Sequence, residues 1–312
     1  MEFLKNTSAY FYILRPKNLF LIALTMTILQ YMVIINFTPG TPVLHQIHFP
    51  IFVLITLIIA GSGYLVNDIF DYEIDKINKP DKMYFSESFS LQSAWKYYYF
   101  LIITGLLLSV FIAVKTSHIF NLWIYPLVVW VLYGYAKKWK SSVLIGNIIV
   151  SLFVGFVWAI LFYVEFTTAD SSARPEISSG LLLEFFIVYF VFAFLINLMR
   201  EVIKDIEDIE GDKMQNIKTL PLIVGVKNAV FFVMIIQSIL LLLIAIWIWK
   251  SDATQLYEIR MFYVLFIICP LLYIFIKLLQ ARNKKDFSLI SRLIKMVMFS
   301  ALIGIVLIGK SF

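Results

Sequence analysis

The sequence predicts an all-α, polytopic membrane protein with nine transmembrane helices. Hydrophobic residues make up 61% of its 312 residues and charged residues only 15%, whereas a typical soluble domain carries about 25% charged residues. Apolar segments also recur along the whole chain, each close to the roughly 20 residues that an α-helix needs to cross a bilayer. These observations exclude a soluble globular protein.

Nine segments have the length and composition of a membrane-spanning helix. They are residues 18–37, 50–67, 95–114, 119–136, 143–163, 181–199, 228–249, 261–279 and 289–309. The third and fourth are so close together that they predict a tight hairpin. The first is too long for a cleaved signal peptide, so we expect it to be a retained helix. No intervening stretch has room for a soluble domain, and we expect one integral membrane domain over residues 1–312.

The distribution of positive charge predicts the orientation of these helices. Most of the 26 Lys and Arg residues lie in segments on the same side as the N-terminus. The opposite side receives only Lys115, Arg174, Lys250, Arg260 and Lys310. Because cytoplasmic loops are enriched in Lys and Arg, we expect an integral protein of the cell (inner) membrane with a cytoplasmic N-terminus. This topology explains the formal net charge of +6, so we expect no nucleic-acid partner.

Two acidic clusters repeat one spacing, i, i+3 and i+7, directly after two apolar segments. The first stripe comprises Asp68, Asp71 and Asp75, and the second stripe comprises Asp205, Asp208 and Asp212. At ~100° per residue, three such positions fall within about 60° of one another around an α-helix. Each cluster therefore predicts a row of carboxylates on one helix at the cytoplasmic membrane surface.

Three carboxylates on one row repel one another, so each stripe requires a cation. Hard divalent cations prefer oxygen ligands, and Mg²⁺ is commonly shared between carboxylates and substrate phosphates. The two stripes therefore predict a pair of Mg²⁺ ions that carry a diphosphate. Two other interpretations stay open: solvated helix ends that only mark the membrane surface, and a membrane cation-binding or transport protein. Transport sites usually lie near the midplane, where these segments carry little acidic character.

The motif Asn67-Asp68-x-x-Asp71-x-x-x-Asp75 resembles the first Asp-rich motif of the UbiA family of intramembrane prenyltransferases, and Asp208-x-x-x-Asp212 resembles the second. The nine segments and the positions of both motifs agree with that family along nearly the whole chain. The resemblance implies a UbiA-like fold with the helices around a central cavity. It also implies Mg²⁺-dependent prenyl transfer, at the cytoplasmic face, from a polyprenyl diphosphate to a lipophilic acceptor dissolved in membrane lipid.

A longer run indicates one branch of the family. Residues 200–212 and the following Lys218-Thr219-Leu220-Pro221 are similar to the branch that transfers geranylgeranyl to a prenylated glycerol phosphate. We therefore expect geranylgeranylglyceryl phosphate as the acceptor, with prenylation of an aromatic quinone precursor as the alternative. Residues 83–88 depart from the family, because Met-Tyr-Phe-Ser-Glu-Ser replaces its usual Pro-x-x-Ser-Gly-like stretch.

The resemblance also implies roles for individual side chains. The expected catalytic residues are Asn67, Asp68, Asp71, Asp75, Asp208 and Asp212. The expected metal ligands are all six aspartates of the two stripes, including Asp205. Substrate binding is expected from Tyr64, Lys137, Lys140, Asn147, Arg200 and Lys204. The four cations among them can donate charge-assisted hydrogen bonds to phosphate oxygens.

Overall fold

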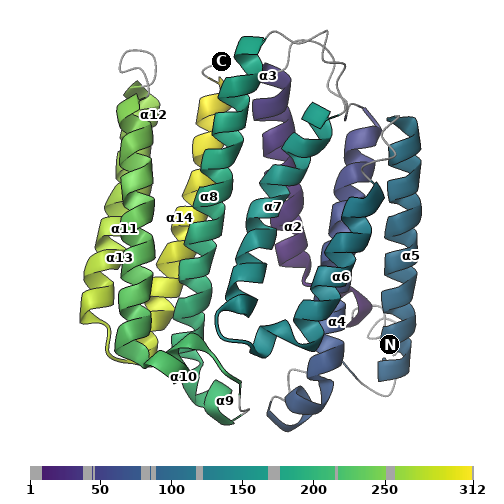
Figure 1. Cartoon of the computed structure of the whole chain (residues 1–312), viewed down its shortest axis with the longest axis horizontal. Helices are drawn as coiled ribbons and strands as arrows, with labels where there is room; N and C mark the ends of the chain where they lie inside the picture. The colour runs from purple at the N-terminus through teal and green to yellow at the C-terminus, as the bar shows by residue number, and fades with distance from the viewer. Residues whose placement is uncertain are drawn as a thin grey trace. The chain divides into compact units, whose positions relative to one another are not determined.

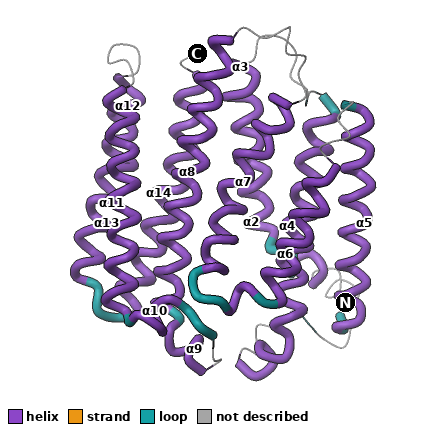
Figure 2. Tube along the Cα trace, viewed as in Figure 1, coloured by secondary structure: helices purple, strands orange, loops and turns teal. Residues whose placement is uncertain are grey.

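A computed structural model of the chain describes residues 9–37, 44, 46–78, 85, 89–116, 122–167, 176–214, 217–250 and 257–310. Every regular element in these ranges is helical (Figures 1 and 2). The all-α prediction is therefore confirmed. The divergent segment 83–88 lies outside the described residues, apart from Phe85.

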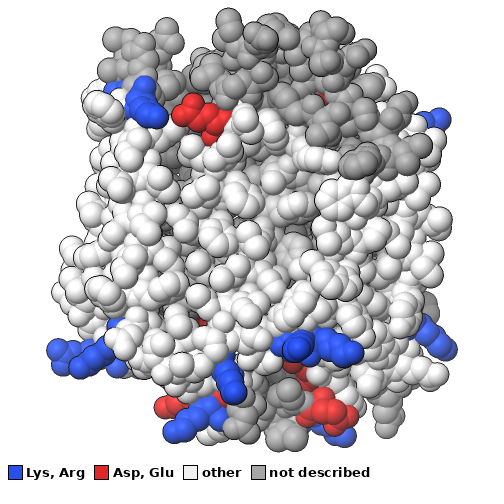
Figure 3. All heavy atoms as spheres, in the orientation of Figure 1, with Lys and Arg blue, Asp and Glu red and all other residues white. Residues whose placement is uncertain are grey.

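Eight of the described helices are long and apolar enough to cross a membrane, which makes the chain an integral membrane protein. The remaining predicted segment, 119–136, corresponds to α6 (Ile124–Lys137), which has 14 residues against the roughly 20 that a span needs. Residues 117–121, just before α6, lie outside the described part of the chain. On the face drawn in Figure 3, the described charged side chains gather mainly at the helix ends.

The helices fall into two compact units, and each unit is described by itself. The first unit is Met1–Thr27, Thr41–Lys140 and Tyr163–Ala173, and the second is Ile28–Gly40, Ser141–Phe162 and Arg174–Phe312. The long elements of the first unit are α2 (Pro16–Ile28, up to Thr27), α4 (His48–Asn78), α5 (Leu91–Lys115) and α6. The expectation of one membrane domain stays a prediction.

The second unit contains the remaining elements. They are η1 (Leu29–Ile34), α3 (Ile35–Phe37), α7 (Ile145–Thr167, up to Phe162), α8 (Glu176–Glu207), α9 (Ile209–Met214), α10 (Leu220–Val224), α11 (Val226–Lys250), α12 (Tyr257–Tyr263), η6 (Val264–Ile268), α13 (Cys269–Gln280) and α14 (Lys284–Lys310). Both η1 and η6 are π-helical stretches. Pro270 is the second residue after η6, and because proline lacks a backbone N–H it cannot donate an α-helical hydrogen bond.

In the first unit, α4 packs against both α5 and α6. Leu65, Val66 and Ala94 are fully buried in its apolar core. Gly63 lies so close to α6 that an added Cβ would be 3.0 Å from the Leu132 side chain. Small residues of this kind allow membrane helices to approach closely. This packing places the polar end of α4 beside the turn that follows α6.

In the second unit, α8 packs against both α11 and α14. Buried aromatic side chains connect it with further elements. The Trp158 ring of α7 stacks on the Tyr189 ring of α8 with centroids 4.8 Å apart. The Tyr189 hydroxyl also lies within hydrogen-bonding distance of the Tyr263 hydroxyl at the end of α12. These contacts hold α8 firmly upstream of its acidic C-terminal end.

Candidate active site

The first stripe lies on a single unbroken helix. The α4 helix runs from His48 to Asn78 and so includes Asp68, Asp71 and Asp75, in agreement with the predicted spacing. The side chains of Asp68 and Asp71 are 13% and 24% exposed. The side chain of Asp75 lies outside the described part of the structure. Two partly buried carboxylates one turn apart therefore require partners with positive charge.

Arg15 supplies the first of these charges. Its Nη2 donates to Oδ1 of Asp68 at 2.8 Å, and its guanidinium lies 4.9 Å from the centre of the Tyr64 ring. Arg15 has a φ of +56°, in the left-handed region that few residues other than glycine adopt. Such conformations persist where the surroundings hold them and often occur at functional sites. The Tyr64 ring thus supports the Arg15 guanidinium from one side. Arg15 was not among the residues predicted for the site.

Lys140 supplies the second charge, from the turn after α6. Its Nζ donates to Oδ1 of Asp71 at 2.5 Å and to Oδ1 of Asn67 at 3.5 Å. Asn67 in turn donates through Nδ2 to Oδ2 of Asp71 at 3.0 Å. The structure therefore brings together Asn67, Asp71 and Lys140, three of the residues that the sequence marked, in one hydrogen-bonded network.

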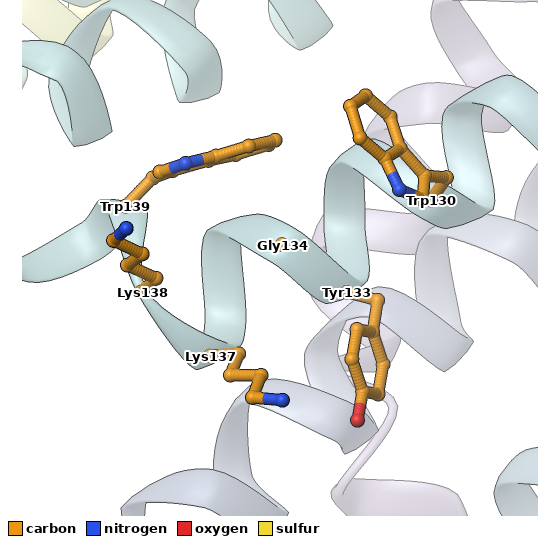
Figure 4. A pocket seen from close by; sticks show the side chains of 6 residues that line it. All are labelled: Trp130, Tyr133, Gly134, Lys137, Lys138 and Trp139. Atoms are coloured by element: carbon orange, nitrogen blue, oxygen red, sulfur yellow. The ribbon is translucent and has the colours of Figure 1, made fainter.

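Lys137 lies in a different environment from Lys140. It lines an aromatic cavity of about 410 Å³ together with Trp130, Tyr133, Gly134, Lys138 and Trp139. The Trp139 ring folds back over Gly134, and the Lys137 amine lies 5.9 Å from the centre of the Tyr133 ring (Figure 4). This cation–π contact is typical of a lysine at an aromatic membrane interface. The structure thus separates two lysines that the sequence treated alike.

The second stripe departs from the predicted single helix. The α8 helix ends at Glu207 and α9 begins at Ile209, so the helix is interrupted at Asp208. Backbone hydrogen bonds still join Asp208 N to Lys204 O at 2.9 Å and Asp212 N to Asp208 O at 3.0 Å. The helix is interrupted here because several negatively charged carboxylates lie near its C-terminus, where the helix dipole is also negative and destabilises them. Asp205 and Asp212 therefore lie on two consecutive helices.

The three carboxylates of the second stripe also differ in their surroundings. Asp205 accepts a 2.7 Å hydrogen bond at Oδ2 from Nδ2 of Asn147, at the start of α7. Asp208 is 60% exposed, with the Lys284 amine 3.8 Å away. Asp212 is partly buried. Asn147, expected to bind substrate, is thus bonded to a carboxylate, and Lys284 is a neighbour that the sequence analysis did not select.

Arg200 and Lys204 share the carboxylate of Glu201, which lies four residues before Asp205 on the same face of α8. Nη1 of Arg200 lies 2.6 Å from Oε1 of Glu201, and Nζ of Lys204 lies 3.4 Å from Oε2 of the same side chain. Deeper in α8, Asn197 donates to the Ser151 hydroxyl of α7 at 3.2 Å. Both predicted cations are therefore beside the second stripe, and Glu201 holds them in place.

The donor set suits Mg²⁺ in chemistry. Carboxylate oxygens are its preferred protein ligands, and in the first unit the Asp68 and Asp71 carboxylates each accept a hydrogen bond from a cationic side chain. Among the described residues, however, no three His, Cys, Asp or Glu side chains are gathered into a ready metal site.

Comparison with known proteins decides the family. The model of the UbiA prenyltransferase family matches residues 19–303. The chain belongs to this family. A digeranylgeranylglyceryl phosphate synthase from Methanococcus aeolicus is 33% identical over 258 residues, which cover 81% of this chain and 82% of the relative. The predicted family is confirmed, and the chain is a prenyltransferase.

Solved structures agree with this assignment. A structure of a digeranylgeranylglyceryl phosphate synthase is 25% identical, with a TM-score of 0.69 and 100% coverage of both chains. A UbiA homolog from Archaeoglobus fulgidus bound to DMAPP and Mg²⁺ is 16% identical, with a TM-score of 0.58 over 93% of this chain and 98% of that one. The UbiA-like fold is therefore confirmed.

Proposed function

We propose that this prenyltransferase carries out Mg²⁺-dependent transfer of a prenyl group from a polyprenyl diphosphate to geranylgeranylglyceryl phosphate. The observation that carries the proposal is the pairing of each partly buried carboxylate of the first stripe with a cation, Arg15 on Asp68 and Lys140 on Asp71. The M. aeolicus relative is a digeranylgeranylglyceryl phosphate synthase, and the A. fulgidus homolog binds DMAPP with Mg²⁺. Both support this choice of substrates.

The three aspartates of each stripe would hold metal in their own unit. Mg²⁺ bound there would neutralise the charge that develops on the leaving diphosphate. In this proposal the carboxylates of Asp68 and Asp71 would be the ligands that hold the ion in the first unit. Their cationic partners, Arg15 and Lys140, would donate charge-assisted hydrogen bonds to diphosphate oxygens. The carboxylates would thus serve the metal and their cationic neighbours the diphosphate.

The transfer itself needs orientation and the exclusion of water. As the bond between the allylic carbon and the diphosphate oxygen breaks, the acceptor hydroxyl oxygen bonds to that carbon and its proton passes to the released diphosphate. Water would compete for the allylic carbon, so a dry apolar surrounding protects it. Tyr64 presents an aromatic ring beside the first stripe, and such a ring can stabilise positive charge. Asn67 fixes the position of Asp71.

The location follows the charge distribution. We propose that the N-terminus and both stripes face the cytoplasm of the cell membrane, since most Lys and Arg residues lie on that side of the predicted topology. A diphosphate made in the cytosol then reaches the stripes without crossing the bilayer. The lipid chains of both substrates stay in the membrane.

A transfer assay tests the proposal. The purified protein in liposomes is given Mg²⁺, radiolabelled geranylgeranyl diphosphate, and either geranylgeranylglyceryl phosphate or an aromatic acid. We expect labelled product from the glycerol phosphate, none without Mg²⁺, and none from the Asp71→Ala and Asp208→Ala variants. Product from the aromatic acid alone would instead support the quinone-precursor alternative. No transfer to either acceptor, with unchanged Mg²⁺ binding in both variants, would leave a cation-binding membrane protein.

A further inference from the structure

A buried hydrogen-bond donor near the end of α8 has no acceptor. Arg200 is only 18% exposed, and its Nη1 is used by Glu201. Its Nε, however, is buried and finds no hydrogen-bond partner in the described part of the chain. A buried N–H without an acceptor is costly, and more so when the group is charged. Such an atom indicates that an anionic ligand completes the site.

Two more cations gather around this guanidinium. Lys204 lies one turn further along α8 and reaches the same Glu201 carboxylate at 3.4 Å. Lys295 comes from α14, which packs against α8. The positive charges of Arg200 and Lys204 act on Lys295 across this contact. Three cations therefore gather near the end of α8, and two of them are paired with Glu201.

These cations lie beside the carboxylates of the second stripe, since Lys204 is four residues before Asp208. Arg200 and Lys204 are four residues apart and share one face of the helix. Asp205 is rotated about 100° away from Lys204, and it is held by Asn147 of α7. The cluster of Arg200, Lys204 and Lys295, which we call the basic cluster, therefore adjoins the second stripe without belonging to it.

We propose that the basic cluster binds the phosphate monoester of the acceptor lipid, in a subsite beside the aspartates. This inference rests on the proposed function and extends it to acceptor recognition. A phosphate monoester carries about 1.5 to 2 negative charges and three acceptor oxygens, which match two amines and a planar guanidinium with a spare N–H. The donor diphosphate, by contrast, can be held through Mg²⁺ on the aspartates.

Steady-state kinetics of Lys295→Ala test the subsite. We expect the KM for geranylgeranylglyceryl phosphate to rise about 10- to 100-fold, the range for loss of a charged hydrogen bond. The KM for geranylgeranyl diphosphate should stay unchanged, and Lys295→Arg should restore the acceptor KM. Lys285→Ala, which removes an exposed charge on the same helix, is the matched control. A raised KM for the diphosphate instead, or no change in either KM, would overturn the proposal.

A second acceptor identifies the chemical group that is recognised. Geranylgeranylglycerol has the same chains without the phosphate, so the wild-type protein should use it poorly. Lys295→Ala should not raise the KM for geranylgeranylglycerol any further, because this acceptor lacks the phosphate that Lys295 binds. An equal loss with both acceptors would show a general structural defect and contradict the proposal.

Binding without metal separates this subsite from catalysis. In EDTA, geranylgeranylglyceryl phosphate should still quench the tryptophan fluorescence of the wild-type protein in detergent, with weaker affinity in Lys295→Ala. If the wild-type protein transferred no prenyl group to either acceptor, the proposed function would fail. The binding measurement would then test the phosphate subsite independently of prenyl transfer. Equal affinity of the wild-type protein and Lys295→Ala for geranylgeranylglyceryl phosphate would overturn the subsite.

Discussion

The two acidic stripes share one spacing, yet the chain holds them differently. The first stripe lies on one unbroken helix, with Arg15 on Asp68 and Lys140 on Asp71. The second is interrupted at Asp208, which is largely exposed, and its Asp205 accepts a hydrogen bond from a neutral amide. The same spacing therefore has close cationic partners in the first stripe, at 2.8 and 2.5 Å, whereas in the second a lysine lies 3.8 Å from an exposed aspartate. The residues that pack around each stripe cause this difference.

The largest effect that would sharpen this comparison concerns Lys140. We expect Lys140→Met to reduce prenyl transfer roughly 100-fold, since it removes a charged hydrogen-bond donor from both Asp71 and the diphosphate. Lys137→Met is the matched control, because Lys137 contacts the Tyr133 ring in the aromatic cavity. Radiolabelled transfer assays at saturating Mg²⁺ measure the rate of prenyl transfer by each variant. Equal losses in the two variants would contradict the separation of these lysines.

A smaller effect concerns stability without metal. Arg15→Ala should lower the free energy of unfolding in EDTA by about 1–3 kcal/mol, because it leaves the partly buried Asp68 carboxylate without its donor. Lys284→Ala in the second unit should cost less than about 1 kcal/mol, as is usual for an exposed ion pair. Denaturant titration in detergent measures both values. Saturating Mg²⁺ should recover part of the Arg15→Ala loss, and the absence of any recovery would argue against a metal on this stripe.

The smallest expected effect concerns Asn147. Asn147→Leu should weaken Mg²⁺ affinity about 10-fold, because residues that orient metal ligands typically contribute this much. Calorimetric titration of Mg²⁺ in the presence of a non-hydrolysable prenyl diphosphate analogue measures it. Asn228→Leu is a control, since Asn228 is exposed and bonded only to the Val224 carbonyl among the described contacts. A similar loss in both variants would show that the effect is not specific to Asp205.

The sequence indicated the carboxylates of the site more completely than their partners. Asp68 and Asp71 follow from a local spacing on one helix, which the structure reproduces in α4. Their cations lie 53 and 69 residues away in the chain, and local periodicity holds no information about such pairs. Arg15 carried a visible signal, an arginine directly before Pro16 at the start of an apolar segment. Lys295 carried none, because it resembled an ordinary cytoplasmic lysine.

What the sequence determined by itself is the fold class, the membrane character, the family and the two acidic stripes. These properties depend on composition and on residues within two helical turns of one another, where the 3.6-residue period fixes the geometry. Only the tertiary structure decided that Lys140 lies on Asp71 and Lys137 in the aromatic cavity, and that Arg200 and Lys204 share Glu201. Those outcomes depend on how the helices pack, because residues in the same helical turn can face different neighbouring helices.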